Sequence, residues 1–125
     1  MGVRRFEDLE AWQAATDLKR EVYALTDQGT AIRDFKFRDQ IRDSAASAPR
    51  NIAEGFGRFR PASFAHFVEI AIGSLMETQC LLRDGFDRHH FSASQVAGAN
   101  VFAERALRIS TKLAIYLKGR AREKR

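Results

Sequence analysis

Hydrophobic side chains recur along this chain at intervals of three and four residues, the spacing of one face of an α-helix. Within residues 6–26 this spacing is kept by Ala11, Ala14, Leu18, Val22 and Leu25. The pattern predicts a first helix over these residues. Gly29 follows it and is suited to close a helix.

The second run of hydrophobic positions is the most regular in the chain. Asp34 precedes it as a helix cap. The run then steps by three or four residues through Phe37, Ile41, Ala45, Ala48, Ile52, Phe56 and Phe59. Pro49 lies inside it and removes one backbone hydrogen bond. Because the periodicity continues beyond Pro49, we expect a bend there and not the end of the helix.

Two further runs complete the pattern. The third helix is expected to begin near Pro61, a favoured first-turn residue, and to end within 85–90. Its hydrophobic positions are Phe64, Val68, Ala71, Leu75, Leu82 and Phe86. Ser92 or Ser94 is expected to cap the fourth helix, which ends at Gly119. Its buried face is Ala99, Phe102, Ala106, Ile109, Leu113 and Leu117.

Four amphipathic helices joined by short connections favour sequential antiparallel neighbours. The sequence therefore predicts an all-α fold, an antiparallel up-down-up-down four-helix bundle over residues 1–119, followed by a basic tail at 120–125. A length of 125 residues suits one domain. No strand pattern, internal repeat or linker divides the chain.

Small polar and aromatic residues lie off the main hydrophobic stripes, where a subunit interface would place them. The expected interface residues are Leu9, Trp12, Tyr23, Gln40, Ser44, Ser47, Asn51, Glu54, Arg58, Ile70, Gly73 and Ser74. Alternatively, the helix faces are rotated and these residues widen the core of one chain. The spacing of Glu54 from Arg58 is typical of an ion pair within a helix.

Net charge adds a second expectation. The chain carries +5, and its last 22 residues hold 8 of the 21 Lys and Arg but only 2 of the 16 acidic residues. A positive terminus of this kind suits a nucleic acid, because cations neutralise phosphates. The expected contacts are Arg105, Arg108, Lys112, Lys118, Arg120, Arg122, Lys124 and Arg125. A solvated, solubilising tail is the alternative.

Residues that support catalysis or metal binding are few. Cys80 is the only cysteine, which excludes an intramolecular disulfide and a multi-cysteine metal site. Asp87, His89 and His90 lack a fourth ligand, so we expect no metal and no cofactor. Arg83 and His89 resemble the spaced Arg and His of small helical ribonucleases, in which His is a general base and Arg stabilises phosphoryl charge.

The N-terminus and the most apolar segment indicate the cellular location of the protein. Its N-terminus has no apolar run behind its basic pair, so no signal peptide is expected. Charged residues interrupt the apolar segment 64–82 and argue against a membrane span. We therefore expect a cytoplasmic protein with neither a membrane partner nor a small-molecule substrate.

Several motifs resemble a known family. These are Gln40-Ile41-Arg42, Asn51-Ile52-Ala53-Glu54-Gly55-Phe56-Gly57-Arg58, Gly73-Ser74-Leu75-Met76-Glu77 and the opening Phe6-Glu7-Asp8-Leu9 with Trp12. They are similar to the 23S rRNA-intervening-sequence proteins. The resemblance implies an up-down bundle that forms a homopentamer, with no known reaction. A related accessory protein of diversity-generating retroelements is a basic pentameric barrel that binds nucleic acid.

From these observations we expect a non-enzymatic homo-oligomer that binds RNA or DNA without strong sequence preference through its C-terminal helix. Residues 1–103 carry no positive excess, unlike a broadly basic barrel, so that helix must supply most of the charge. A structural or protein-interaction module is the alternative. A metal-independent ribonuclease using Arg83 and His89 is a third hypothesis.

Overall fold

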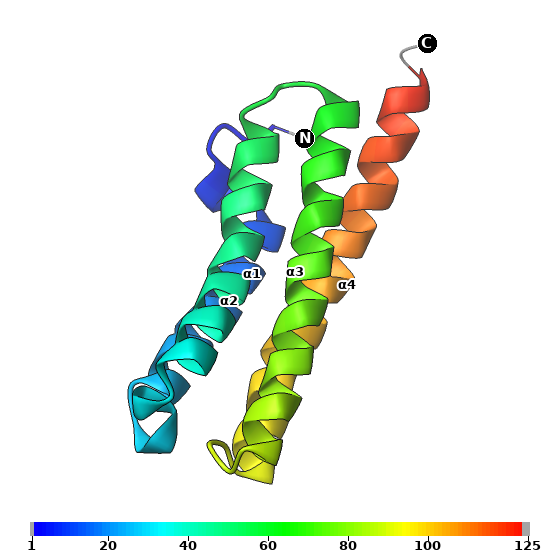
Figure 1. Cartoon of the computed structure of the whole chain (residues 1–125). Coiled ribbons are helices and arrows are strands. Elements are labelled where there is room, and N and C mark those ends of the chain that lie inside the picture. The colour runs from blue at the N-terminus through cyan, green and yellow to red at the C-terminus, as the bar shows by residue number, and fades with distance from the viewer. Residues whose placement is uncertain (1, 124–125) are drawn as a thin grey trace.

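Four long helices form the structure, a computed structural model that describes residues 2–123. The helices are α1 (Glu10–Thr26), α2 (Phe35–Phe56), α3 (Pro61–Asp87) and α4 (Ala93–Glu123), with short 3-10 helices η1 (Phe6–Asp8) and η2 (Gly29–Arg33) before α1 and α2. The chain runs up and down through the four helices, and each packs against its neighbours in a ring (Figure 1). The predicted all-α up-down bundle is confirmed, and no strand occurs within residues 2–123.

The core lies where the predicted stripes meet. Every predicted core position of α1 is buried, and so is the α2 stripe from Phe37 to Ile52. On α4 the buried face includes Ala99, Ala106 and Leu117, as predicted. The other buried residues of α4 are small, and the larger predicted core residues between them are only half-buried. Small side chains let α4 lie close to its neighbours, while removal of the larger apolar groups from water drives association.

The ends of the helices follow local chemistry. The Asp34 carboxylate accepts the Phe37 backbone N–H at 3.4 Å and caps α2. At the start of α4, Ser92 accepts the Gln95 backbone N–H at 3.1 Å, while the Gln95 side chain accepts the Ser92 N–H at 2.8 Å. This reciprocal capping box selects Ser92 over Ser94 as the cap. Both caps agree with the expectation from the sequence.

Several predicted boundaries and core positions are wrong. α2 ends at Phe56, so Phe59 leaves the stripe and is 87% exposed. Phe86 also lies on the surface, because the buried positions at the end of α3 are Leu81, Leu82 and Gly85. Gly119 does not end α4, which continues to Glu123, so most of the expected tail is helical. Pro49 lies within α2, and the helix continues through it as expected.

A ladder of small hydroxyl groups joins α2 to α3. Ser44 Oγ lies 2.8 Å from Thr78 Oγ1 and donates to the Ser74 carbonyl at 3.1 Å, and Ser47 Oγ lies 2.9 Å from Ser74 Oγ. Asn51 extends the ladder by donating to the Ser47 carbonyl at 2.8 Å. The stripe expected at a subunit interface is therefore used within the chain. Of this stripe only Ser44 is buried, while Ser47 and Asn51 are half-buried, so the interface prediction stays open for them.

Leu9 and Ser44 are corrections to the expected interface, since both are buried inside a single chain. Sequence periodicity does not fix which neighbour a helix face meets, and so it does not reveal that Ser44 bonds to α3. Leu9 lies just before α1 and packs into the core of the chain. Trp12 and Tyr23 are half-buried. Trp12 packs edge-on against Phe6 with ring centroids 5.4 Å apart, and the Arg42 guanidinium lies 4.9 Å from the Tyr23 ring centre.

The remaining expected interface residues stay accessible. Glu54 and Arg58 form the predicted ion pair, with Arg58 Nη2 at 3.0 Å from Glu54 Oε2, but Arg58 lies in the turn that follows α2. Gln40, Ile70 and Gly73 are exposed on α2 and α3. Within residues 2–123, no helix combines the length and apolar character needed to cross a membrane.

Candidate nucleic-acid interface

One end of the bundle gathers segments that are far apart in sequence. The N-terminal segment 2–5, the α2–α3 loop 57–60 and the last turns of α4 from 116 to 123 all lie there, and we call this the basic end (Figure 1). A pocket of about 300 Å³ opens between them. Arg4, Arg60 and Arg120 line it together with Phe56, Phe59, Phe64 and Tyr116.

The three arginines differ in how they are held. Arg120 Nη1 donates to the Tyr116 hydroxyl at 2.9 Å, its guanidinium lies 5.9 Å from the Tyr116 ring centre, and its Nε is 4.0 Å from a Glu123 carboxylate oxygen. Arg4 and Arg60 are exposed and make no ion pair with any residue in the range 2–123. Arginines from three segments therefore lie around one hollow, and two of them have no ion pair within residues 2–123.

Phe59 lies at the rim of this pocket in an unusual conformation. Its φ is 60°, in the left-handed region that bulky residues avoid, and its side chain is 87% exposed. An exposed aromatic ring contributes little to folding, and the left-handed backbone costs energy. The Arg58-Phe59-Arg60 sequence between Gly57 and Pro61 is the signal for this site, but the hydrophobic periodicity assigns Phe59 to the core.

The expected basic residues of α4 separate into two groups. Arg105 pairs with Asp17 at 3.5 Å and Lys118 with Glu69 at 2.6 Å, so α1 and α3 neutralise them. Exposed and without ion pairs in the described part of the chain are Arg108, Lys112 and Arg122. Lys112 lines a second hollow, of about 520 Å³ between α1 and α4, beside Asp8 and Glu10. Lys124 and Arg125 lie outside the described residues.

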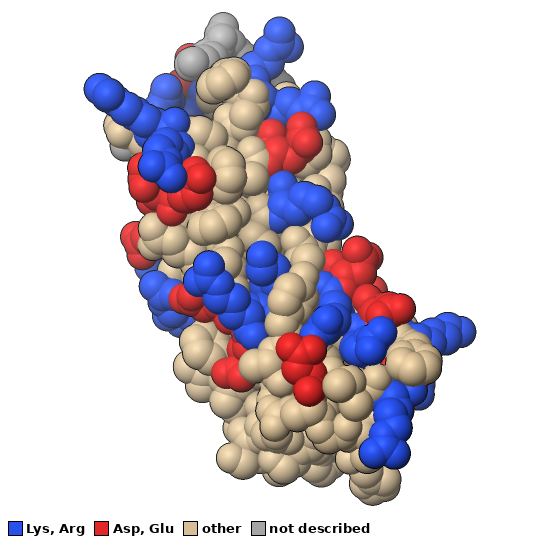
Figure 2. All heavy atoms as spheres, turned by 90° about the vertical axis from the view of Figure 1, so that its left-hand side faces the viewer, with Lys and Arg blue, Asp and Glu red and all other residues tan. Residues whose placement is uncertain are grey.

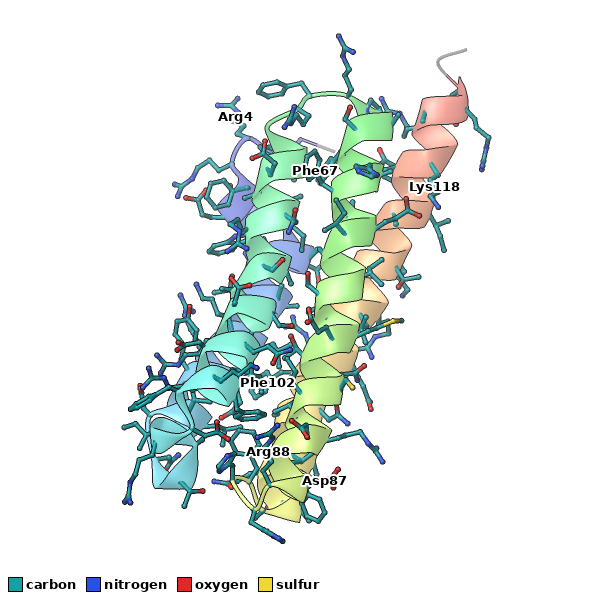
Figure 3. All side chains as sticks on the ribbon, in the orientation of Figure 1. Arg4, Phe67, Asp87, Arg88, Phe102 and Lys118 are labelled. Atoms are coloured by element: carbon teal, nitrogen blue, oxygen red, sulfur yellow. The ribbon has the colours of Figure 1, made fainter. Side chains whose placement is uncertain are left out.

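Charge over the rest of the molecule is mixed. On the face shown in Figure 2, basic and acidic side chains intermingle over the upper and middle parts of the bundle, while the lower part carries few charged groups. Figure 3 shows Arg4 and Lys118 toward the basic end and Asp87 and Arg88 at the opposite end. At the basic end, Arg4 and Arg60 join Arg120 through the convergence of segments, and the C-terminal charge count does not include them.

The opposite end contains the candidate nuclease residues without bringing them into one site. His89 occupies the left-handed position after α3, with φ 65°, and its N–H bonds to the Phe86 carbonyl while the His90 N–H bonds to that of Gly85. This pairing is a Schellman motif that closes a helix. Arg83 lines a separate shallow hollow with Phe86 and Asp87. No hydrogen bond connects Arg83 to His89 within residues 2–123.

His90 instead ties two loops together. Its Nδ1 lies 2.7 Å from the Thr30 hydroxyl and its Nε2 lies 2.9 Å from Asp34 Oδ2, while Arg88 Nη1 lies 3.3 Å from the same oxygen. The hydrogen bond from His90 is the largest cause that lowers the pKa of Asp34; the Phe37 N–H and the charge of Arg88 act in the same direction, and burial opposes them. Hydrogen bonds and an ion pair therefore connect the α1–α2 loop to the α3–α4 loop at this end.

Within residues 2–123, no three His, Cys, Asp or Glu side chains lie together as ligands for a metal ion. Cys80 is exposed on α3.

Comparison with known proteins agrees with the fold and the motifs. The family model of the 23S rRNA-intervening sequence protein matches residues 7–112, which span η1 to the middle of α4. The C-terminal part of the basic end lies beyond the match. No curated protein matches the chain. On the extent of the family match, this chain belongs to the 23S rRNA-intervening sequence protein family.

Proposed function

We propose that this protein is a non-enzymatic homo-oligomer that binds RNA or DNA without strong sequence preference through its basic end. The supporting observation is that Arg4, Arg60 and Arg120 come from three separate segments to line one pocket. Arg122 is exposed on the adjoining turn of α4. Family membership by itself assigns no ligand.

The chemistry of these residues favours phosphate. Guanidinium groups donate two parallel hydrogen bonds to phosphate oxygens and stay charged at all physiological pH values. Contacts with phosphate carry little sequence information, so binding should tolerate many sequences and weaken as salt rises. The basic end is small, and a single copy supplies only a few such contacts. Several copies in one assembly would add theirs to one strand.

Self-association forms the second part of the proposal. Ile70, Met76, Val101 and Ile115 are large apolar residues exposed on the outer faces of α3 and α4, where contact with another copy would remove them from water. The expected assembly is a pentamer of the 14.2 kDa chain. A solution mass measurement tests it, and a monomeric mass across the micromolar range would contradict it.

Fluorescence anisotropy with generic RNA and DNA at low and moderate salt tests nucleic-acid binding. The double variant Arg60→Gln with Arg120→Gln should bind more weakly. The log–log slope of its affinity against salt should become shallower by about 0.7 to 0.9 for each phosphate that the protein no longer neutralises. The matched control is Lys36→Gln with Arg83→Gln, which removes equal charge from two exposed sites toward the opposite end.

The outcomes separate the functions. Binding that is weakened only in the Arg60 and Arg120 variant supports the basic end as the interface. Equal weakening in the control pair would show that charge anywhere on the bundle suffices, which contradicts the assigned site. No binding by the unaltered protein at low salt would reject nucleic acid as a partner and favour a protein-interaction module.

A further inference from the structure

Aromatic groups in the pocket of the basic end are not equivalent. Phe56 and Phe64 pack edge to face with ring centroids 6.0 Å apart, and Phe64 is buried. Tyr116 is 41% exposed and is engaged by Arg120. Phe59 is the ring left open, at 87% exposure and with no aromatic partner in the described chain. One aromatic face is therefore available to a ligand.

Three arginines line the same pocket as that ring. Arg60 follows Phe59 directly in the chain, and Arg4 and Arg120 line the same hollow from the N-terminal segment and from α4. A volume of about 300 Å³ lies at the lower limit of small-molecule pockets. The pocket thus combines an exposed aromatic ring with positive charge at a size that suits one planar group and its attached anion.

The conformation of Phe59 supports a role in binding. A left-handed φ of 60° would suit Gly or Asn better, and the ring gains no burial in return for this strain. A planar group stacked on Phe59 would remove the ring from water. The combination of π-stacking and neighbouring guanidinium groups is how proteins hold unpaired bases of single strands.

We propose that this pocket binds one unpaired nucleotide of a single strand, with its base stacked on Phe59 and its flanking phosphates on Arg60 and Arg4. The inference rests on the proposed function and deepens it, because it names the form of nucleic acid that is preferred. Bases within a duplex are already stacked and paired, so a blunt duplex offers the pocket only phosphates. Single strands and unpaired ends are therefore favoured ligands.

Anisotropy titration with three labelled probes tests this inference: a single strand, an abasic strand of equal length, and a blunt duplex of the same sequence. The unaltered protein should bind the base-containing strand about 5- to 150-fold more tightly than the abasic strand, the range expected for one stacked base. Phe59→Asn suits the left-handed backbone and should fold well, but it should bind the two strands equally. Phe59→Tyr keeps a ring and should retain the preference.

Phe35→Ala is the matched control, because Phe35 is also exposed, at 63%, but lies at the start of α2 toward the opposite end. It should leave the preference unchanged. This inference would be overturned if the unaltered protein bound base-containing and abasic strands equally, or if the preference survived in Phe59→Asn. Salt-sensitive binding in the same titrations would still support the proposed function. Failure to bind any probe at low salt would overturn both.

Discussion

Gly55 ends the Asn51–Gly55 motif at a close contact between α2 and α3. A methyl group placed there would lie 2.8 Å from Phe67 Cβ, 2.9 Å from Phe64 Cδ1 and 3.2 Å from the Phe64 carbonyl oxygen. Carbon atoms pack best at about 3.5 to 4.0 Å. A Cβ atom and a backbone carbonyl cannot rotate away, so Gly55→Ala forces the two helices apart.

Gly73 provides the matched comparison within α3. It is exposed, and a methyl group there would meet nothing within 4 Å. Gly73→Ala should therefore stabilise the fold by about 0.5 to 1 kcal/mol, the ordinary helix-propensity gain. Gly55 would receive part of the same gain near the end of α2, but overpacking costs about 1 to 3 kcal/mol. We expect a net loss of about 1 to 2 kcal/mol for Gly55→Ala.

Urea denaturation followed by circular dichroism measures both free energies of unfolding, at one protein concentration because assembly would couple to stability. Thermal midpoints should move in the same directions, by roughly 4 °C per kcal/mol for a chain of this size. A Gly55→Ala protein as stable as the unaltered chain, or more stable, would refute the close α2–α3 contact. The Gly73→Ala result shows that the assay detects the propensity gain by itself.

Two further predictions concern the opposite end. The pKa of Asp34 is lowered in the folded chain, so its carboxylate adds stability at pH values above its unfolded pKa, and this stability is lost as pH falls through the lower folded value. Asp34→Asn should therefore have a lower free energy of unfolding than the unaltered chain at neutral pH. The difference between the two free energies should disappear below about pH 4. A difference that stays constant from pH 7 to 3 would exclude the linkage. His89→Gly should raise the free energy of unfolding by about 1 kcal/mol, because glycine accepts φ 65° without strain. The variant and the unaltered chain should both leave incubated RNA intact. Cleavage by the unaltered chain but not by the variant would restore the ribonuclease hypothesis.

Local signals explain most of what could be predicted. The stripes of α1 and α2, the caps at Asp34 and Ser92, and the start of α3 at Pro61 depend on residues within one or two turns of one another. The error at Phe59 has the same origin. Its spacing continues the α2 stripe, but the helix has already ended at Phe56, and periodicity carries no information about where backbone bonding stops.

The candidate site was only partly accessible from sequence. The C-terminal cluster points to α4, yet Asp17 and Glu69 neutralise two of its members from α1 and α3. Arg4 and Arg60 join Arg120 only because an even number of antiparallel helices returns the chain to the end where it began (Figure 1). A count of charges along the chain cannot register that convergence.

The sequence by itself determined the four helices, their capped beginnings and their buried stripes, because 3.6-residue periodicity and capping act over a few residues. Only the tertiary structure decided which neighbour each face meets. The Ser44 and Ser47 stripe bonds to α3 within one chain, and arginines from three segments meet at the basic end. Those pairings depend on the packing of distant elements, in which Gly55 sets how closely α2 approaches α3.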